Sequence, residues 1–468
     1  MNSIKNRLLA CVLLFSFNFF VSAQEETIDN AAADAQPTQR QTQNPAETAQ
    51  LATIKYGTDT EIAALIQTLK NENADYLDNE LIAVAQGTRN QRILSGVFTF
   101  FADREKTGLE DRAMQAIYDR DIEAVESVLA AIDYLGKVRA GQAEDILKEL
   151  LNSQERRFMN NAFRALGRVG RAGQADGNST AEFLIDYYTN RDPGDENRRE
   201  IIAAIGETRS ASGVDFLAEI ANGSDERVPL RMAALDALAK IGDTAGLDAI
   251  LAAINATDPN VRSSAVAALG PYSGENVELA ILEAFRDSYY RTRIAAAQAS
   301  SERKLESAVP YLKFRSERDE VPQVKDEAIR ALGAIANDEA LEILYGLFAE
   351  RKNSDRVRLI AAEAMMKNVP AKHLAQLIVE LDEAKQKNLN PLYNGFLKII
   401  GESYSENLET LARRFLVSGG IIEKSYGLDM AANNNFTGLS EEIKKISEDK
   451  NESLARKARR TLEKLGIE

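Results

Sequence analysis

The chain has 468 residues, of which 44% are apolar, and it carries 57 Lys and Arg against 72 Asp and Glu, a net charge of -15 at pH 7. This excess of negative charge repels a phosphate backbone, which argues against nucleic acid as a partner. The chain has one histidine and one cysteine, Cys11. Those two counts exclude zinc sites built from His or Cys and an intrachain disulfide framework.

Residues 1–23 have the features of a secretory signal peptide. Lys5 and Arg7 form a basic start, Leu8–Phe20 an apolar core, and Val21-Ser22-Ala23 a small-residue cleavage site. The apolar core is shorter than the roughly 20 residues that a membrane-spanning helix needs. We therefore expect cleavage after the last of these residues, a periplasmic or secreted mature protein of net charge -17, and no membrane span after cleavage.

The next segment, residues 24–58, is rich in Gln, Thr, Ala, Asn and Pro. It has no apolar stripe that would offset the entropy of ordering the chain. The composition predicts a flexible polar linker that connects the signal segment to the rest of the chain.

From residue 59 to residue 468, glycines recur near the ends of predicted helices, in steps of 28 to 39 residues or about twice that. The recurring glycines are Gly136, Gly167, Gly206, Gly242, Gly270, Gly333, Gly401 and Gly466. A period of about 33 residues is typical of stacked helical hairpins. The pattern predicts an all-α fold, a right-handed α-α superhelix of about twelve helical hairpins.

Apolar periodicity divides this region into twelve helical pairs and a last single helix. The predicted units begin near Asp59, Asn90, Asp121, Ser153, Asp195, Asp225, Asp258, Tyr289, Pro322, Asp355, Asn388 and Gly420, and the single helix near Asn451. In one well-formed unit we expect Asp225 to cap the first helix and Gly242 to take the left-handed position after its end. Leu247, Ile250 and Ile254 then follow at helical spacing.

A single unit is too small to be stable alone. Burying about eight large apolar side chains gains roughly 10 to 20 kcal/mol, whereas ordering about 33 residues costs roughly 1 to 2 kcal/mol for each backbone unit. Neighbouring units must therefore share one hydrophobic spine. We expect a long concave surface, lined by the second helices of the pairs, as the working surface.

The stretch Asp258-Pro259-Asn260-Val261-Arg262, with Ala265, Ala268, Leu269 and Gly270 after it, resembles the opening helix of a HEAT repeat. It is most similar to the HEAT-like type named after phycobilisome lyases, and the resemblance covers about residues 59–468. It implies a polar ladder between repeats, formed by the opening Asp and a following Arg. The matching residues are Asp225, Asp258 and Asp355 with Arg231, Arg262 and Arg358.

The sequence offers few groups for catalysis. The only histidine is His373, whereas the iron sites of deoxyhypusine hydroxylase need several His-Glu pairs. The sequence also has no nucleophile elbow, phosphate loop or dinucleotide motif. We expect His373 to be solvated or to cap a helix, and we predict no catalytic residue, cofactor or metal. Asp192, Asp195 and Glu196 in a long loop are either Ca²⁺ ligands without the EF-hand spacing or ordinary surface residues.

Aromatic and basic residues near repeat junctions are the candidate partner contacts, because Tyr and Arg are enriched at binding hot spots. They are Tyr187, Tyr188, Tyr289, Tyr290, Arg291, Tyr311, Phe314, Arg413 and Arg414. Ordinary helix packing is the other explanation for most of them.

The predicted function is a non-catalytic scaffold that binds a protein or an extended peptide, preferably a basic one. One alternative is a ligand-binding protein or enzyme similar to phycobilin lyases, and the other is a structural component of the envelope. The sequence makes no prediction of the oligomeric state or of the partner's identity.

Overall fold

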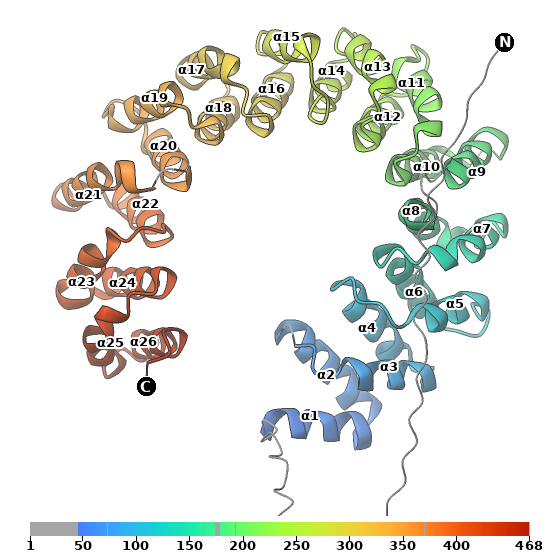
Figure 1. Ribbon diagram of the computed structural model, residues 1–468, viewed down its shortest axis with the longest axis horizontal. Coiled ribbons are helices and arrows are strands. Elements are labelled where there is room, and N and C mark those ends of the chain that lie inside the picture. Colours follow the sequence, from blue (N-terminus) through green and yellow to red (C-terminus); the bar gives the residue numbers. More distant parts are fainter. Residues whose placement is uncertain (1–44, 73, 174–177, 192, 369, 468) are drawn as a thin grey trace, which may run out of the picture.

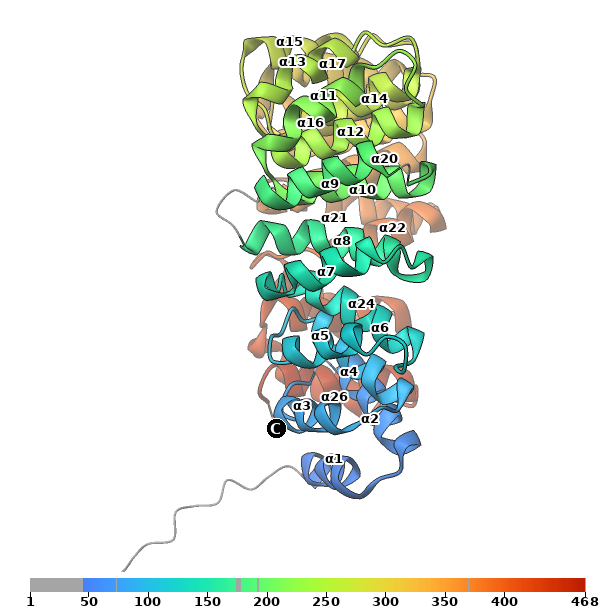
Figure 2. The same cartoon turned by 90° about the vertical axis from the view of Figure 1, so that its right-hand side faces the viewer.

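The computed structural model describes residues 45–467 except 73, 174–177, 192 and 369, so the predicted signal segment lies outside the described residues. The described residues form 26 α-helices and no strand. The helices stack in chain order into an open ring whose ends, α1 and α26, face each other across its opening (Figure 1). Seen edge-on, the ring is a band crossed by the helices (Figure 2). The predicted all-α solenoid is confirmed.

Twelve helical pairs make up most of the ring. Their first helices are α2 (Asp59–Glu72), α4 (Gln91–Ala102), α6 (Val125–Lys137), α8 (Arg156–Gly173), α10 (Asp195–Thr208), α12 (Val228–Ile241), α14 (Pro259–Ala267), α16 (Tyr290–Glu302), α18 (Pro322–Ile335), α20 (Asp355–Asn368), α22 (Asn390–Gly401) and α24 (Ile421–Asn434). Their second helices are α3 (Asp78–Gly87), α5 (Glu110–Tyr118), α7 (Glu144–Asn152), α9 (Asn178–Asn190), α11 (Val214–Asn222), α13 (Leu247–Ala253), α15 (Glu275–Ala284), α17 (Val309–Arg318), α19 (Asp338–Ala349), α21 (Pro370–Gln386), α23 (Leu408–Ser418) and α25 (Ser440–Ser447).

Single helices flank these pairs at both ends, α1 (Pro45–Tyr56) and α26 (Glu452–Lys464). Each predicted unit start lies within four residues of the start of a first helix. The array nevertheless begins earlier than predicted, because α1 falls inside the segment that was expected to be linker. Only Ile54 of α1 is buried in the core. One buried residue leaves no apolar stripe for the sequence to reveal.

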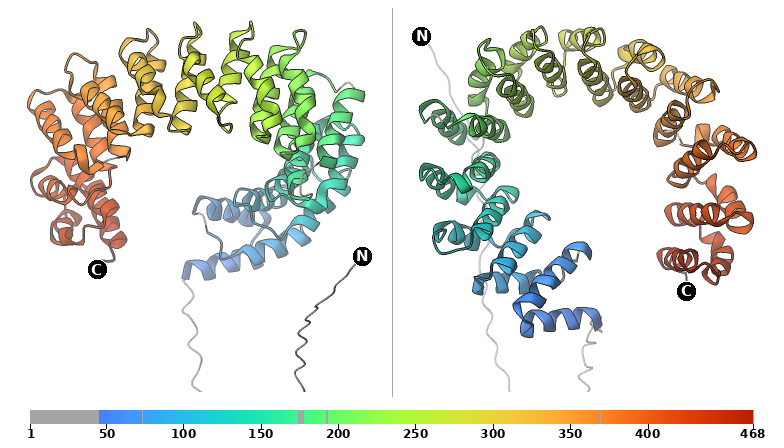
Figure 3. Two further views of the ribbon diagram at one scale, coloured as in Figure 1. Left: turned by 45° about the horizontal axis from the view of Figure 1, so that its top comes forward. Right: turned by 180° about the vertical axis from the view of Figure 1, so that it is seen from behind.

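The first helices of the pairs lie on the inner side of the ring and the second helices on the outer side (Figure 1), and the view from behind shows the same arrangement (Figure 3). The expectation that second helices line the concave surface was therefore wrong. Consecutive inner helices pack more closely together than consecutive outer helices do. A closer spacing on the inner side than on the outer side is what curves the array.

Glycine explains the close packing of the inner helices. Gly136, Gly167, Gly206 and Gly333 lie near the ends of inner helices, and each faces an alanine of the next inner helix. A Cβ atom added at Gly206 would lie 2.7 Å from the Cα atom of Ala237. These four glycines therefore allow close approach between helices, and none of them has a positive φ. The facing alanines are Ala165, Ala204, Ala237 and Ala364.

Gly242 does take the predicted left-handed position after α12, with φ of 70°. Asp225, by contrast, does not cap that helix, because α12 begins at Val228 and Arg227 occupies the N-cap position without a side-chain cap. In the next unit Asp258 is a true cap, since its Oδ1 accepts hydrogen bonds from the amides of Asn260 and Val261.

The hydrophobic spine follows the whole array, and its buried residues form two clusters. One cluster runs from Ile54 to Ala299 and the other from Val266 to Leu465. The clusters meet near α14 and α16, where the partly buried side chains of Ile254 and Leu305 contact both. The junction is thin because α16 buries mainly small side chains, alanines and serine among them.

A ladder of cations joins successive pairs. Five inner helices carry a basic residue at their fourth position, and each side chain donates to a backbone carbonyl at the end of the preceding outer helix or in the turn after it. The residues are Arg231, Arg262, Arg293, Lys325 and Arg358. Carbonyls at a helix C-terminus lack intrahelical donors, so these cations stabilise the helix ends.

Three of these arginines also pair with an acid that follows in the chain, either on the outer helix of the same pair or in the turn after it. Arg262 pairs with Asp287 at 2.8 Å, Arg293 with Asp319 at 2.8 Å, and Arg358 with Glu380 at 2.7 Å. The polar ladder implied by the resemblance therefore exists, but these acids differ from the expected ones, which open the arginine's own unit. Each arginine joins its own unit to the preceding one, because it binds a carbonyl of the preceding unit and an acid of its own.

We expect Gly206→Ala to destabilise the protein, because the new methyl group would overlap the backbone of Ala237. Overpacking of this kind costs about 1 to 3 kcal/mol. The matched control is Gly346→Ala in α19, where no atom lies within 4 Å of an added Cβ and alanine favours a helix by about 0.5 to 1 kcal/mol. Urea unfolding followed by circular dichroism measures both changes. Equal midpoints for the two variants would contradict this account of the inner glycines.

The Arg293–Asp319 pair makes the stability depend on pH. Burial would raise the pKa of Asp319, but hydrogen bonds from Arg293 and from the Val321 amide outweigh burial, so this pKa lies below its usual value. A lowered pKa means that the pair stabilises the fold above about pH 4, the pKa of an unfolded Asp, and that the gain is lost as the pH falls further.

Asp319→Asn should therefore destabilise the protein by about 3 to 5 kcal/mol at pH 7, because it leaves Arg293 buried without a counter-charge. The difference from the unmodified protein should shrink as the pH falls below about 4, since both then lack the charged carboxylate. Urea midpoints measured between pH 7 and pH 2.5 check this. The exposed carboxylate of Asp236 supplies the control, Asp236→Asn. A difference that did not vary with pH would show that the pair does not act through charge.

Candidate functional site

The inner surface of the ring carries charged side chains that bridge neighbouring helices. Lys70 and Lys137 both bind Asp103, at 2.6 and 2.9 Å, and Lys240 binds Glu207 at 3.0 Å. The bond from Lys70 holds the pKa of Asp103 below its usual value despite partial burial. Each of these pairs is partly exposed, so each adds less than about 1 kcal/mol to stability. Much of the inner surface is thus a layer of ion pairs that neutralise one another.

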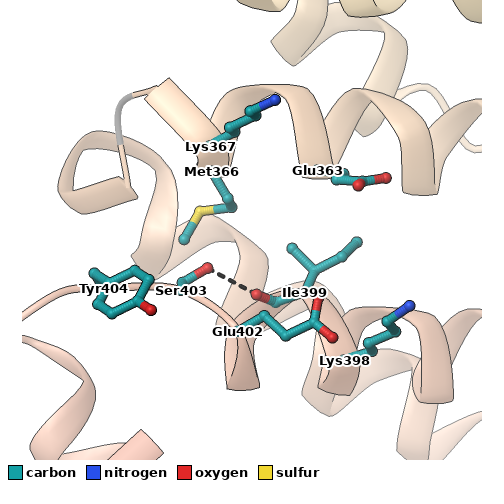
Figure 4. A pocket seen from close by; sticks show the side chains of 8 residues that line it. All are labelled: Glu363, Met366, Lys367, Lys398, Ile399, Glu402, Ser403 and Tyr404. Carbon is teal, nitrogen blue, oxygen red and sulfur yellow. Dashed lines mark hydrogen bonds between the residues drawn. The ribbon is translucent and has the colours of Figure 1, made fainter. Parts of the chain in front are cut away.

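A pocket interrupts this layer between α20 and α22. It has a volume of about 380 Å³ and is lined by Glu363, Met366, Lys367, Lys398, Ile399, Glu402, Ser403 and Tyr404. Figure 4 shows side chains of α20 on one wall, side chains of α22 on the other, and Tyr404 at one end. All the lining residues belong to the two inner helices or to the turn after α22, so the pocket belongs to the inner surface.

The pocket is apolar at its base and charged at its rim. Met366 is almost fully buried and Ile399 is partly buried, whereas Tyr404 is 68% exposed. The Ser403 hydroxyl donates to the Ile399 carbonyl at 2.7 Å, so it is engaged within the fold. An apolar base beside an exposed tyrosine can receive one apolar side chain of a ligand.

Four charged residues surround this apolar base, two on each wall. Glu363 and Lys367 lie on α20, Lys398 lies on α22, and Glu402 directly follows the end of α22 (Figure 4). In the part of the chain that the structure describes, none of the four makes an ion pair or a side-chain hydrogen bond, in contrast to the paired charges elsewhere on the inner surface. Their bonding capacity is available to polar groups of a ligand.

The structure places two of the predicted contact residues in the core. Tyr187 is buried, its hydroxyl donates to the Leu151 carbonyl at 3.2 Å, and its ring meets Phe163 edge-on. Tyr188 is buried edge-on against Phe216. Burial raises the pKa of both tyrosines. Both rings join repeats to one another and leave little surface for a partner.

A second group lies where α16 begins. Tyr289 donates to the Asn260 side chain at 2.9 Å and meets Tyr290 edge-on, and Arg291 donates to the Tyr290 hydroxyl at 3.2 Å. Tyr289 and Tyr290 are half-buried and Arg291 is exposed. These three residues form one local cluster at a turn between an outer and an inner helix.

The remaining predicted contacts lie on outer helices. On α17, Tyr311 stacks on Phe285 and Phe314 is 56% exposed. On α23, Arg413 binds Glu442 of α25, and Arg414 binds Asp382 of α21 through two hydrogen bonds of 2.9 Å. The two arginines tie neighbouring outer helices together. The predicted residues therefore do not converge on one site, and none of them lines the inner pocket.

His373 is buried in the first turn of α21 and stacks on Tyr345. Of the two expectations for this residue, a solvated side chain is wrong, and a role in capping the helix stays a prediction. Of the proposed Ca²⁺ ligands, Asp192 lies outside the described residues. Asp195 binds Arg227, and Glu196 accepts a hydrogen bond from Asn160. The described residues hold no group of three or more His, Cys, Asp or Glu arranged to bind a metal ion. None of the helices described has both the length and the apolar character needed to cross a membrane.

Sequence reasoning missed the inner pocket because its residues come from two different repeats. Met366 and Ile399 look like ordinary core residues of their own helices. The one local feature in the sequence that could have indicated the pocket was Tyr404, a large aromatic residue in the turn after α22 and outside any apolar stripe.

Among solved structures, the chain is similar to the CpcE and CpcF complex of phycocyanin lyase from Nostoc sp., with 17% identity, 61% of this chain and 93% of that chain covered, and a TM-score of 0.31. Human deoxyhypusine hydroxylase is 19% identical, with 49% of this chain and 97% of that chain covered and a TM-score of 0.22. Kap121p bound to Ste12p is 14% identical, with 89% of this chain and 53% of that chain covered and a TM-score of 0.43.

No curated protein matches the sequence. The family model described as "Spirochaete HEAT repeat protein" matches residues 54–461, which is most of the chain and nearly the whole helical array. The protein therefore belongs to the family of spirochaete HEAT repeat proteins.

Proposed function

We propose that the protein is a non-catalytic scaffold that binds another protein, or an extended peptide, on the inner surface of the ring. The observation that carries this proposal is the pocket between α20 and α22. It combines an apolar base, an exposed tyrosine and four charged side chains that have no partner among the described residues.

The occupant that fits this pocket is an apolar side chain flanked by polar or charged groups. Met366 and Ile399 supply the apolar contact, and a methionine side chain adapts to different shapes. Because both walls carry one acid and one base, a segment with charges of both signs is complemented there. Elsewhere the net charge of -15 favours a partner that is basic overall.

The geometry also supports a role without catalysis. The aliphatic hydroxyl in the pocket, that of Ser403, donates to a backbone carbonyl, and the other hydroxyl is the phenol of Tyr404. The one histidine of the chain is packed against Tyr345 in the turn that begins α21 and does not line the pocket. No described side chain in the pocket is thus paired with a base that would activate it as a nucleophile.

We further propose that this binding takes place in the periplasm or outside the cell, on the strength of the signal-like residues 1–23. A scaffold in that location meets envelope proteins. The helical array, which begins at α1, is joined to the signal segment through a stretch rich in Gln, Thr, Ala and Asn.

Truncating the tyrosine at the pocket should weaken partner binding. Tyr404 is 68% exposed, so Tyr404→Ala should leave the stability almost unchanged while lowering affinity about 5-fold to 30-fold, the usual effect of losing a hot-spot aromatic residue. Crosslinking and affinity purification from the native envelope, followed by titration of the recovered partner, measure this.

The matched control is Tyr118→Ala, since Tyr118 is 71% exposed at the end of an outer helix. Its affinity for the partner should not change. If no stoichiometric partner is recovered under several conditions, or if both variants lose affinity equally, the proposed binding surface is wrong.

The proposed location has a separate test. Fractionation of native cells should place the protein in the periplasm or the medium, and mass spectrometry of its N-terminus should show Gln24 as the first residue. A protein recovered from the cytosol with residues 1–23 still attached would overturn the location while leaving the binding surface untouched.

A further inference from the structure

Four arginines gather at the C-terminal ends of three neighbouring inner helices. Arg139 follows α6, Arg168 and Arg171 lie in the last turns of α8, and Arg209 follows α10. We call them the arginine cluster. Three of them, with Lys137, line a cleft of about 360 Å³, far along the ring from the pocket between α20 and α22.

The arginine cluster has more positive than negative charge around it within the described chain. None of its four guanidinium groups makes an ion pair or a side-chain hydrogen bond there, although acids line the same cleft. Two of the three acids that line the cleft are already bound by lysines, Asp103 by Lys70 and Lys137 and Glu207 by Lys240, which leaves Glu105 as the one carboxylate of the cleft without a bond among the described residues. Positive charge is thus left over in a chain whose net charge is -15.

The arginines also act on one another electrostatically. The pKa of Arg171 is lowered, first by burial and then by the positive charges of Arg209 and Arg139. Like charges held close together destabilise a fold, and the side chains of the cluster make no ion pair or hydrogen bond within the described residues that would offset this. The cluster therefore has no visible structural purpose, unlike Arg262, Arg293 and Arg358 of the ladder.

We propose that the arginine cluster binds an acidic segment of the partner protein, a run of Asp or Glu side chains in extended conformation. The inference rests on the proposed scaffold function and adds a second contact to it. Guanidinium groups bind carboxylates through two parallel hydrogen bonds, which gives this contact both strength and direction.

The helix ends favour carboxylates over phosphate. Each C-terminus of α6, α8 and α10 carries a partial negative charge, which opposes a doubly charged anion more than singly charged groups spaced along a peptide. Inner helices pack about 8 to 10 Å apart, so the cluster spans roughly 20 Å across three helices. An extended peptide of about six residues covers that distance.

The test uses the full mature chain and two synthetic eight-residue peptides, one alternating Glu and Ala and the other alternating Lys and Ala. We expect the acidic peptide to bind, measured by fluorescence anisotropy, with affinity that falls as salt is raised from 50 to 200 mM. The triple variant Arg139→Gln, Arg168→Gln, Arg171→Gln should lose about tenfold or more of this affinity. Circular dichroism should show that it still folds, since it loses no internal bond.

The matched control removes the same charge elsewhere, with Arg318→Gln, Arg456→Gln and Arg460→Gln, three exposed arginines far from the cluster. It should bind the acidic peptide almost as the unmodified protein does. Equal losses in the two triple variants, no binding of the acidic peptide, or displacement of that peptide by a lower concentration of inorganic phosphate would each overturn the proposal.

The outcome is distinguishable from that of the scaffold hypothesis. Retained affinity of the cluster variant for a recovered partner, together with reduced affinity of Tyr404→Ala, would refute the acidic contact and leave the scaffold function standing. Binding of the acidic peptide without any recoverable partner would refute the scaffold function and leave the acidic contact standing.

Discussion

The shape of the ring depends on how closely its inner helices approach one another. Glycine faces alanine at four of these crossings, and at Gly206 even one added methyl group would overlap the next helix. Outer helices carry larger side chains at their contacts and stay further apart. The difference in spacing between the two layers bends the stack, so the inner surface exists because small residues occur once in each of several repeats.

The cation ladder complements this packing. The ladder cations of the inner helices bind the carbonyls at or just after the end of the preceding outer helix, and three of them also bind an acid on or just after the outer helix of their own pair. Because these charges are satisfied inside the fold, they are unavailable to ligands. Lys398 and Glu402 at the pocket and Arg168 in the arginine cluster have no such bond among the described residues, and the proposed binding surfaces are based on this contrast.

Sequence periodicity predicted the fold well because the apolar stripe of each repeat lies within about 33 consecutive residues. The helix pairs, the final helix and the left-handed Gly242 followed from local patterns. The side of the ring that each helix occupies did not, since it depends on contacts between repeats. The same limit applies to the binding surface: Met366 and Tyr404 are joined only by the stacking of α20 on α22, and a tyrosine such as Tyr187 gives no local sign that it is internal.

The narrow meeting of the two core clusters has a mechanical consequence. Ile254 and Leu305 are the partly buried side chains that contact both clusters, and the helix between them, α16, buries mainly alanine and serine. Flexing the molecule there separates less apolar surface than flexing it within either cluster. We therefore expect any widening of the ring to occur by rotation of its two arms about this segment, which would leave the local geometry of the pocket and of the arginine cluster, one on each arm, unchanged.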